Sequence, residues 1–173
     1  MTARSAALIR CVRDTERHVA TAGWDAPVRV FALVNTAAAL EADPSLAGLL
    51  DAPDGDPWHL TAVEQEDLPE AETLEELLAQ LAWPPTVDGA AVVVERIVVP
   101  PTVEASLPAD ESSAVAVLAE HPEREDVRLA VAVLRTGETW CALRARSHDA
   151  DDQVAGSSDA APGLVEAVAA TLQ

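Results

Sequence analysis

Lysine and tyrosine are absent from this sequence of 173 residues, and phenylalanine occurs only once. Aromatic residues make up 3% of the chain, so a surface that stacks nucleic-acid bases has very little to be built from. Positive charge is scarce too, because eleven arginines stand against thirty carboxylates and leave a net charge of −19. Phosphate backbones and anionic membranes are bound through clustered positive charge, so we expect neither nucleic acid nor a membrane as a partner.

Cysteine, glycine and long apolar runs are also in short supply. Cys11 and Cys141 are far apart and form no metal-binding or redox spacing. The seven glycines form neither GxGxxG nor GxxxxGK, the loops that hold nucleotide phosphates. No run approaches the roughly 20 apolar residues of a membrane span. Arg10 interrupts the N-terminal apolar stretch before it reaches the length of a signal-peptide core. We therefore expect a cytoplasmic protein that has reduced thiols and no cofactor.

The apolar residues, 49% of the chain, are spaced as in a folded α+β domain. Val127 to Ser147 reads as a β-hairpin around Thr136-Gly137, and a two-residue turn would place Val133 opposite Trp140, whereas a bulge would shift that register. Composition makes residues 51–57 a loop. The remaining apolar patterns predict helices at 4–22, 73–82, 109–120 and 163–172, a short helix after Pro44, and strands at 28–34, 58–64 and 89–99.

These elements predict one domain over residues 1–173. We expect a mainly antiparallel sheet of about five strands, with helices packed on one face and a mobile loop at 150–161. The order of elements is similar to that of profilin-like and roadblock-type interaction modules, which is an analogy of fold alone. The alternative is an α/β domain with a partly parallel sheet.

Charge is unevenly distributed along the chain. Residues 1–29 carry a net charge of +2, residues 30–95 carry −14, and residues 96–173 carry −7. The first helix is thus mildly positive on an acidic body. We expect this helix to pack against that body and to be paired there, and the alternative is that it docks a partner.

The segment RARSHDADD at 144–152 is the one place where several chemical groups gather. His148 with Asp149, Asp151 and Asp152 supplies imidazole and carboxylate ligands that suit several divalent metals, so this group is a candidate metal site. The spacing does not fit a calcium loop, because glycine is missing at the required position. Adjacent side chains of a strand also point to opposite faces. We therefore favour a strand that leaves the sheet through an acidic turn.

Arginines inside the apolar strands form the second candidate site. Arg96 interrupts the apolar strand at 89–99, Arg128 lies near the start of one hairpin strand, and Arg144 and Arg146 share a face near the end of the other. Such charges need partners or solvent. We favour cross-strand pairing with Glu95, Glu125 or Asp126 on an open sheet face. The alternative is a patch that binds an anion or an acidic peptide, since arginine binds carboxylates and phosphates in a bidentate way.

Three segments of the chain carry a resemblance to a known family: AGWDAPVRVFALVNT, then LEELLAQLAWPP with GAAVVVERIVVPP, and HPEREDVRLAVAVLRTGETWCALRARSHDADD. They resemble a family of small acidic cytoplasmic proteins from high-GC actinobacteria, and the use of arginine without lysine fits that origin. The resemblance covers most of the chain. It implies a single compact domain, and it carries over no catalytic residue.

We therefore expect a non-enzymatic domain that binds a protein partner or a second copy of itself, as an adaptor or a homodimer. The first alternative is a metal-dependent hydrolase that uses His148 and the neighbouring aspartates. The second is a module that binds an anion or a small molecule through Arg96, Arg128, Arg144 and Arg146.

Overall fold

The computed structural model describes residues 1–50 and 55–173, so residues 51–54 of the predicted loop at 51–57 lie outside the described part. Its centre is a six-stranded sheet in the order β2-β1-β3-β4-β5-β6, and every neighbouring pair is antiparallel. The predicted α+β class is confirmed, and the partly parallel alternative is wrong. The strands are β1 (Arg29–Asn35), β2 (Leu60–Glu64), β3 (Gly89–Val98), β4 (Glu125–Leu134), β5 (Thr139–Ala145) and β6 (Ala155–Ser157).

Helices occur at all four of the longer predicted positions. The short helix expected after Pro44 forms as a 3-10 turn, in which the Asp43 carboxylate accepts from the Ser45 N–H. Within the described residues, no helix combines the length and the apolarity that a membrane crossing requires. The helices are α1 (Ala3–Ala20), α2 (Thr36–Ala42), α3 (Leu74–Ala79), α4 (Pro101–Glu104), α5 (Glu111–Glu120) and α6 (Pro162–Ala170), with 3-10 turns η1 (Pro44–Gly48), η2 (Arg146–His148) and η3 (Asp151–Gln153).

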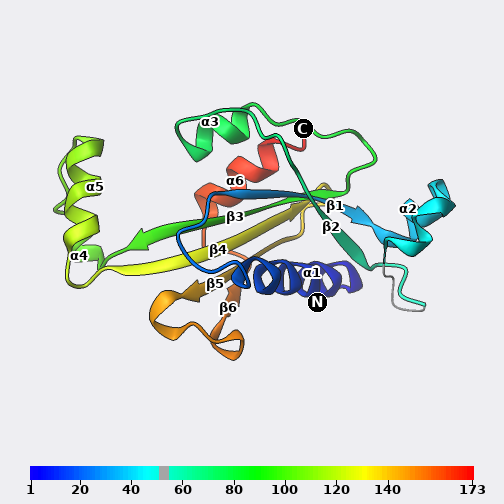
Figure 1. Cartoon of the computed structure of the whole chain (residues 1–173), viewed down its shortest axis with the longest axis horizontal. Coiled ribbons are helices and arrows are strands. Elements are labelled where there is room, and N and C mark those ends of the chain that lie inside the picture. The colour runs from blue at the N-terminus through cyan, green and yellow to red at the C-terminus, as the bar shows by residue number, and fades with distance from the viewer. Residues whose placement is uncertain (51–54) are drawn as a thin grey trace.

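Helices cover both faces of the sheet, whereas the sequence analysis expected one covered face (Figure 1). On β3, Ala91 and Val93 face α1, and Val92 and Val94 face α3 and α6. The physical reason is visible in the sequence, because β3 and β4 are nearly continuous apolar runs and not alternating ones. A strand of that composition has to be buried on both sides. The fold is therefore three layers, with two apolar cores separated by the sheet.

Helix α1 packs against the sheet and is held at its edges by ion pairs. Its hydrophobic residues Leu8, Val12 and Val19 are buried at helical spacing, and the Thr2 hydroxyl caps its first turn by accepting from the Ser5 N–H. The expectation that this positive helix pairs with the acidic body is confirmed, through Arg4 with Glu138 at 3.8 Å, Arg10 with Asp56 at 2.8 Å and Arg17 with Asp151 at 3.5 Å.

The turn between β4 and β5 contains three residues, 135–137. The register expected for a two-residue turn is therefore wrong, and the strands pair in the register shifted by one residue. The Leu134 N–H donates to the Glu138 carbonyl at 2.9 Å, and Gly137 closes the loop with a φ of +103°. Val133 consequently lies opposite Thr139. The same register places Arg128 directly opposite Arg144 on the face that α1 covers.

The segment at 150–161 contains a strand that the sequence analysis missed. Strand β6 pairs with β5 at the sheet edge, where Ala142 lies opposite Gly156. A Cβ at Gly156 would lie 2.6 Å from the ring of Trp140, so glycine allows this close approach. The pattern gave no sign of a strand, because AGS contains no β-branched or aromatic residue. The mobility of this segment stays a prediction.

A projection extends from one end of the sheet, and we call residues 97–123 the arm (Figure 1). It contains the last residues of β3, the helices α4 and α5, and the turn before β4. Strand β1 pairs only with the first half of β3, as far as Val93, so the β3–β4 ribbon continues beyond it. Val99 is the only buried residue of the arm. The arm is thus outside both apolar cores.

Gly89 is required by the close contact of β3 with β4. A Cβ there would lie 2.5 Å from the Val133 carbonyl oxygen and 2.7 Å from Leu134 Cδ2. We predict that Gly89→Ala lowers the free energy of unfolding by about 1 to 3 kcal/mol, as overpacking does in other cores. Gly48→Ala, with nothing within 4 Å of its added Cβ, should stay within about 0.5 kcal/mol of the wild type. Urea denaturation of both variants measures the difference, and equal stabilities would contradict the prediction.

Candidate functional site

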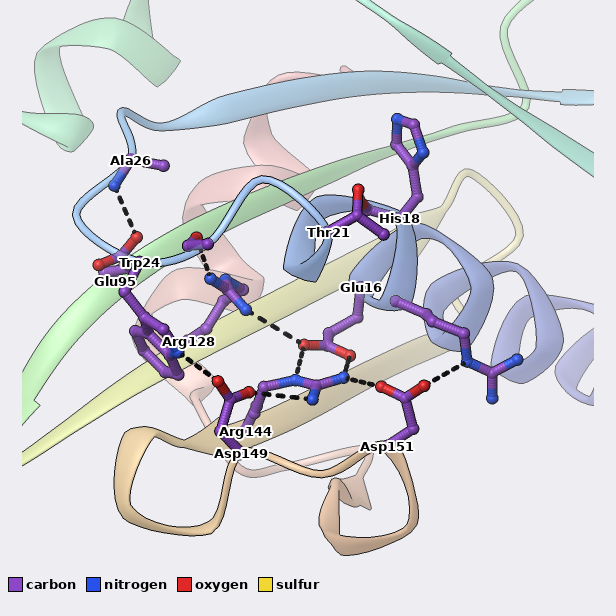
Figure 2. Close-up of polar contacts among 12 residues, drawn as sticks. Glu16, His18, Thr21, Trp24, Ala26, Glu95, Arg128, Arg144, Asp149 and Asp151 are labelled. Atoms are coloured by element: carbon purple, nitrogen blue, oxygen red, sulfur yellow. Dashed lines mark hydrogen bonds and ion pairs between the residues drawn. The ribbon is translucent and has the colours of Figure 1, made fainter.

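A carboxylate from α1 lies buried between the helix and the sheet, and it organises the charged groups around it (Figure 2). Glu16 is 1% exposed, and Arg144 on β5 is 2% exposed. Arg144 Nε donates to Glu16 Oε1 at 2.6 Å and Arg144 Nη2 donates to Oε2 at 2.9 Å. This two-point pairing is the strongest geometry available to an arginine and a carboxylate.

Arg128 on β4 brings a second buried cation to the same carboxylate. Its Nη1 lies 3.7 Å from Glu16 Oε1, and its Nη2 donates to the Gly23 carbonyl at 2.7 Å. The guanidinium also lies over the Trp24 ring, 4.4 Å from the ring centre. Glu16 therefore sits between two guanidinium groups, and the ring of Trp24 covers one of them.

The chain after β5 turns back and adds two more carboxylates to this cluster. Arg144 donates to Asp149 Oδ1 at 3.1 Å and to Asp151 Oδ1 at 2.6 Å, and the Trp24 indole N–H donates to Asp149 Oδ2 at 2.9 Å. The hydrogen bond to Glu16, followed by that to Asp151, raises the pKa of Arg144 above its ordinary value. The indole N–H, followed by Arg144, lowers the pKa of Asp149. Arg144 and Asp149 therefore both stay charged at neutral pH.

The predicted metal ligands are not brought together. Asp149 and Asp151 face Arg144, whereas the His148 Nδ1 lies 2.9 Å from the Ser147 hydroxyl, which itself donates to Glu125. Over residues 1–50 and 55–173, no group of three histidine, cysteine or carboxylate side chains is placed to hold a metal ion. The interpretation of RARSHDADD as a strand that leaves the sheet agrees with the end of β5 at Ala145.

The four strand arginines divide into a buried pair and two exposed residues. Arg128 and Arg144 meet at Glu16, as described above. Arg146 donates to both carboxylate oxygens of Asp25 at 3.1 Å and to Asp126 at 3.4 Å. Arg96 lies 3.7 Å from Glu75 of α3. Arg96 and Arg146 line one pocket of about 460 Å³, together with Arg124 and the carboxylates of Asp25, Glu95 and Asp126.

Of the three carboxylates expected to pair with these arginines, Asp126 contacts Arg146 just beyond the end of β5, Glu125 accepts from Ser147, and Glu95 binds backbone groups. Glu95 lies opposite Arg128 in the sheet, yet its carboxylate accepts from the backbone N–H groups of Asp25 and Ala26 at 2.8 and 2.9 Å. The partner of Arg128 comes from the helix instead. Sequence reasoning missed Glu16, although a signal existed: Glu16 lies four residues after Val12 and therefore on the buried stripe of α1.

A separate pocket of about 400 Å³ lies between α1 and β2, and two histidines line it. His18 and His59 reach it from different elements, which the sequence could not reveal. His59 Nδ1 is 2.7 Å from the Thr36 hydroxyl. Burial raises the pKa of the Cys11 thiol, also in the lining, to about 11, so this sulfur stays protonated and is a poor nucleophile at neutral pH. Phe31 and Leu60 contribute apolar walls.

Fold and site together define a three-layer α+β domain in which a buried Glu–Arg–Arg cluster joins helix α1 to the sheet. The chain matches the PPA1309-like protein family over residues 8–173, and it belongs to that family. No curated protein and no solved structure matches the chain. The similarity to profilin-like and roadblock-type modules therefore stays a prediction.

Removing the shared carboxylate is expected to destabilise the whole domain. In Glu16→Gln the shape is kept, but two buried guanidinium groups lose their common counter-charge. Because breaking a buried ion pair leaves uncompensated charge, we predict a loss of about 3 to 5 kcal/mol in the free energy of unfolding. Asp14→Asn on an exposed position of α1 is the matched control and should change stability by less than about 0.5 kcal/mol. Denaturant titration that finds the two variants equally stable would contradict this role for Glu16.

The lowered pKa of Asp149 predicts a pH-dependent contribution to stability. Because the folded pKa lies below the unfolded value of about 3.9, the charged form of Asp149 stabilises the fold above that pH, and the contribution is lost as the pH falls through the folded value. Asp149→Asn should therefore be less stable than the wild type at pH 7, by under about 1 kcal/mol because the side chain is 45% exposed. Thermal unfolding from pH 7 to pH 2 measures the gap, which should close at the acid end; a gap independent of pH would exclude the charge as its cause.

Proposed function

We propose that this chain is a non-enzymatic cytoplasmic protein-interaction domain, and that the arm is the surface on which its partner docks. The observation that carries the proposal is the composition of α5. Residues 114–119 of this helix read AVAVLA, so apolar side chains point to every side of it. A helix of that kind is normally buried, yet no residue of α5 is buried.

Exposed apolar side chains are concentrated on the arm. Val115 is 56% exposed and Val117 is 41% exposed, on different sides of α5. Ile97 and Val98 are exposed at the end of β3, the strand with which α5 is in contact. Figure 1 shows α5 at the end of the β3–β4 ribbon, away from α1, α3 and α6. Grouped apolar exposure of this kind is typical of binding surfaces, whereas single exposed residues are common everywhere.

The charge cluster is a less favourable binding site than the arm. An anion at Arg144 would have to displace Asp149 or Asp151, since Glu16 and these two carboxylates accept from its donor nitrogens. Metal-dependent hydrolysis has little support for a similar reason, because those same aspartates are engaged by arginine and His148 faces Ser147. The arm, by contrast, leaves Ile97, Val98, Val115 and Val117 between 36% and 56% exposed.

Replacing two valines of α5 is expected to reduce partner capture strongly. Val115→Gln/Val117→Gln keeps good helix propensity while removing the apolar side chains. Each valine that becomes buried in a complex contributes on the order of 1.5 kcal/mol, so we predict a loss of roughly tenfold or more in captured partner. The measurement uses the immobilised chain to capture proteins from a lysate of the cells in which it is native, and quantifies them by mass spectrometry.

The matched control changes exposed apolar residues at the opposite end of the sheet. Leu49→Gln/Val63→Thr removes comparable apolar surface, since these residues are 79% and 43% exposed. It should capture the same proteins as the wild type. The proposal fails if the α5 variant captures the wild-type set undiminished, or if both variants lose it equally.

A further inference from the structure

The charges of the arm narrow the kind of partner that its apolar surface fits. The arm contains five carboxylates and no arginine, so its net charge is −5. All five carboxylates are exposed, and none takes part in an ion pair within the described residues, in contrast to the arginine-bound acids around Glu16. The five are Glu104, Asp110, Glu111, Glu120 and Glu123.

The acidic residues frame the apolar part of α5 at both of its ends. Asp110 and Glu111 precede the apolar run, and Asp110 also caps the helix by accepting from the Ser113 N–H at 2.9 Å. Glu120 and Glu123 follow the run. An apolar centre inside a charged and solvated rim is the usual anatomy of a protein–protein interface.

Resting on the proposed function, we infer that the arm binds a partner segment whose apolar side chains are bordered by arginine or lysine. Opposite charges around an apolar contact speed the encounter of two proteins and suppress wrong partners, since like charges brought together at such a rim are costly. The carboxylates at both ends of α5, which have no ion-pair partner among the described residues, provide one half of that pattern. The complementary half is a short apolar stripe with basic flanks.

A second copy of the chain is a poorer occupant of the same surface. A two-fold symmetric contact would bring the arm of one copy against the arm of the other. Each arm has a net charge of −5 and each chain has −19. Carboxylates of two arms in direct contact would lie within the Debye length of about 8 Å at physiological salt, so they would repel each other. An anionic lipid surface is disfavoured by the same repulsion.

Two synthetic peptides provide the probe. Both form an amphipathic helix with a leucine stripe, bordered by arginines in one peptide and by glutamates in the other. Fluorescence anisotropy measures their binding to the full chain at low and at high salt. We expect the arginine-bordered peptide to bind at least tenfold more tightly than its counterpart, and its affinity to fall with added salt.

Two variants of equal net charge separate the arm from the general acidity of the chain. Glu104→Gln/Glu120→Gln/Glu123→Gln neutralises the arm. Glu41→Gln/Glu66→Gln/Glu70→Gln neutralises three exposed carboxylates elsewhere. The arm variant should bind the arginine-bordered peptide about tenfold more weakly than the wild type, and the control variant should bind it within about twofold. Equal weakening in both variants, or equal binding of both peptides, overturns the inference.

The α5 variant distinguishes failure of this inference from failure of the proposed function. If Val115→Gln/Val117→Gln loses the peptide but neutralising the arm does not, the arm binds partners and only the charge requirement is wrong. If the α5 variant binds the peptide as tightly as the wild type, the apolar docking surface itself is wrong. A dimer in light scattering that Val115→Gln/Val117→Gln dissociates, or binding to vesicles containing phosphatidylserine, also overturns the inference by naming another occupant.

Discussion

The carboxylate of Glu16 is the interaction on which the arrangement of this domain depends. Burying one acid between two guanidinium groups has a large desolvation cost, and it is tolerated only when the remaining donors are satisfied. Here Arg144 also donates to Asp149 and Asp151, and Arg128 donates to a backbone carbonyl and lies over the ring of Trp24. Arg128 Nη1 is the exception, because it has no hydrogen-bond partner among the described residues and lies 3.7 Å from Glu16 Oε1. One buried group therefore fixes the first helix, two central strands, the loop at 23–26 and the chain after β5 in one geometry.

The arm differs from the rest of the fold because, in the described part of the chain, no other layer packs over its apolar side chains. The run LAVAVL in β4 and the run AVAVLA in α5 are nearly the same in composition. The first is enclosed by helices on both faces of the sheet, whereas the second projects from the end of the β3–β4 ribbon. The two runs are equally apolar, but only the run in β4 is buried. This difference in burial leads us to propose the run in α5 as a docking surface.

Local patterns anticipated much of the fold and little of the site. Capping by Thr73 and the leucine spacing of α3 are contained in a few neighbouring residues, so the helix could be predicted without tertiary contacts. The covered second face of the sheet was missed, although the nearly continuous apolar runs of β3 and β4 indicate burial on both sides. Strand β6 was missed because its residues carry no intrinsic β preference. The pairing of Arg128 with Glu16 joins residues distant in sequence, which no local pattern can indicate.

The sequence by itself determined the α+β class, the single antiparallel hairpin and the acidic surface, because each depends on composition or on short-range periodicity. Only the tertiary structure decided which arginines are buried, which histidines share a pocket and which apolar run is left uncovered. The one-residue shift at the β4–β5 turn illustrates the difference. That shift places Arg128 opposite Arg144. Helix α1 packs on the same face of the sheet, and this packing brings the Glu16 carboxylate between the two guanidinium groups.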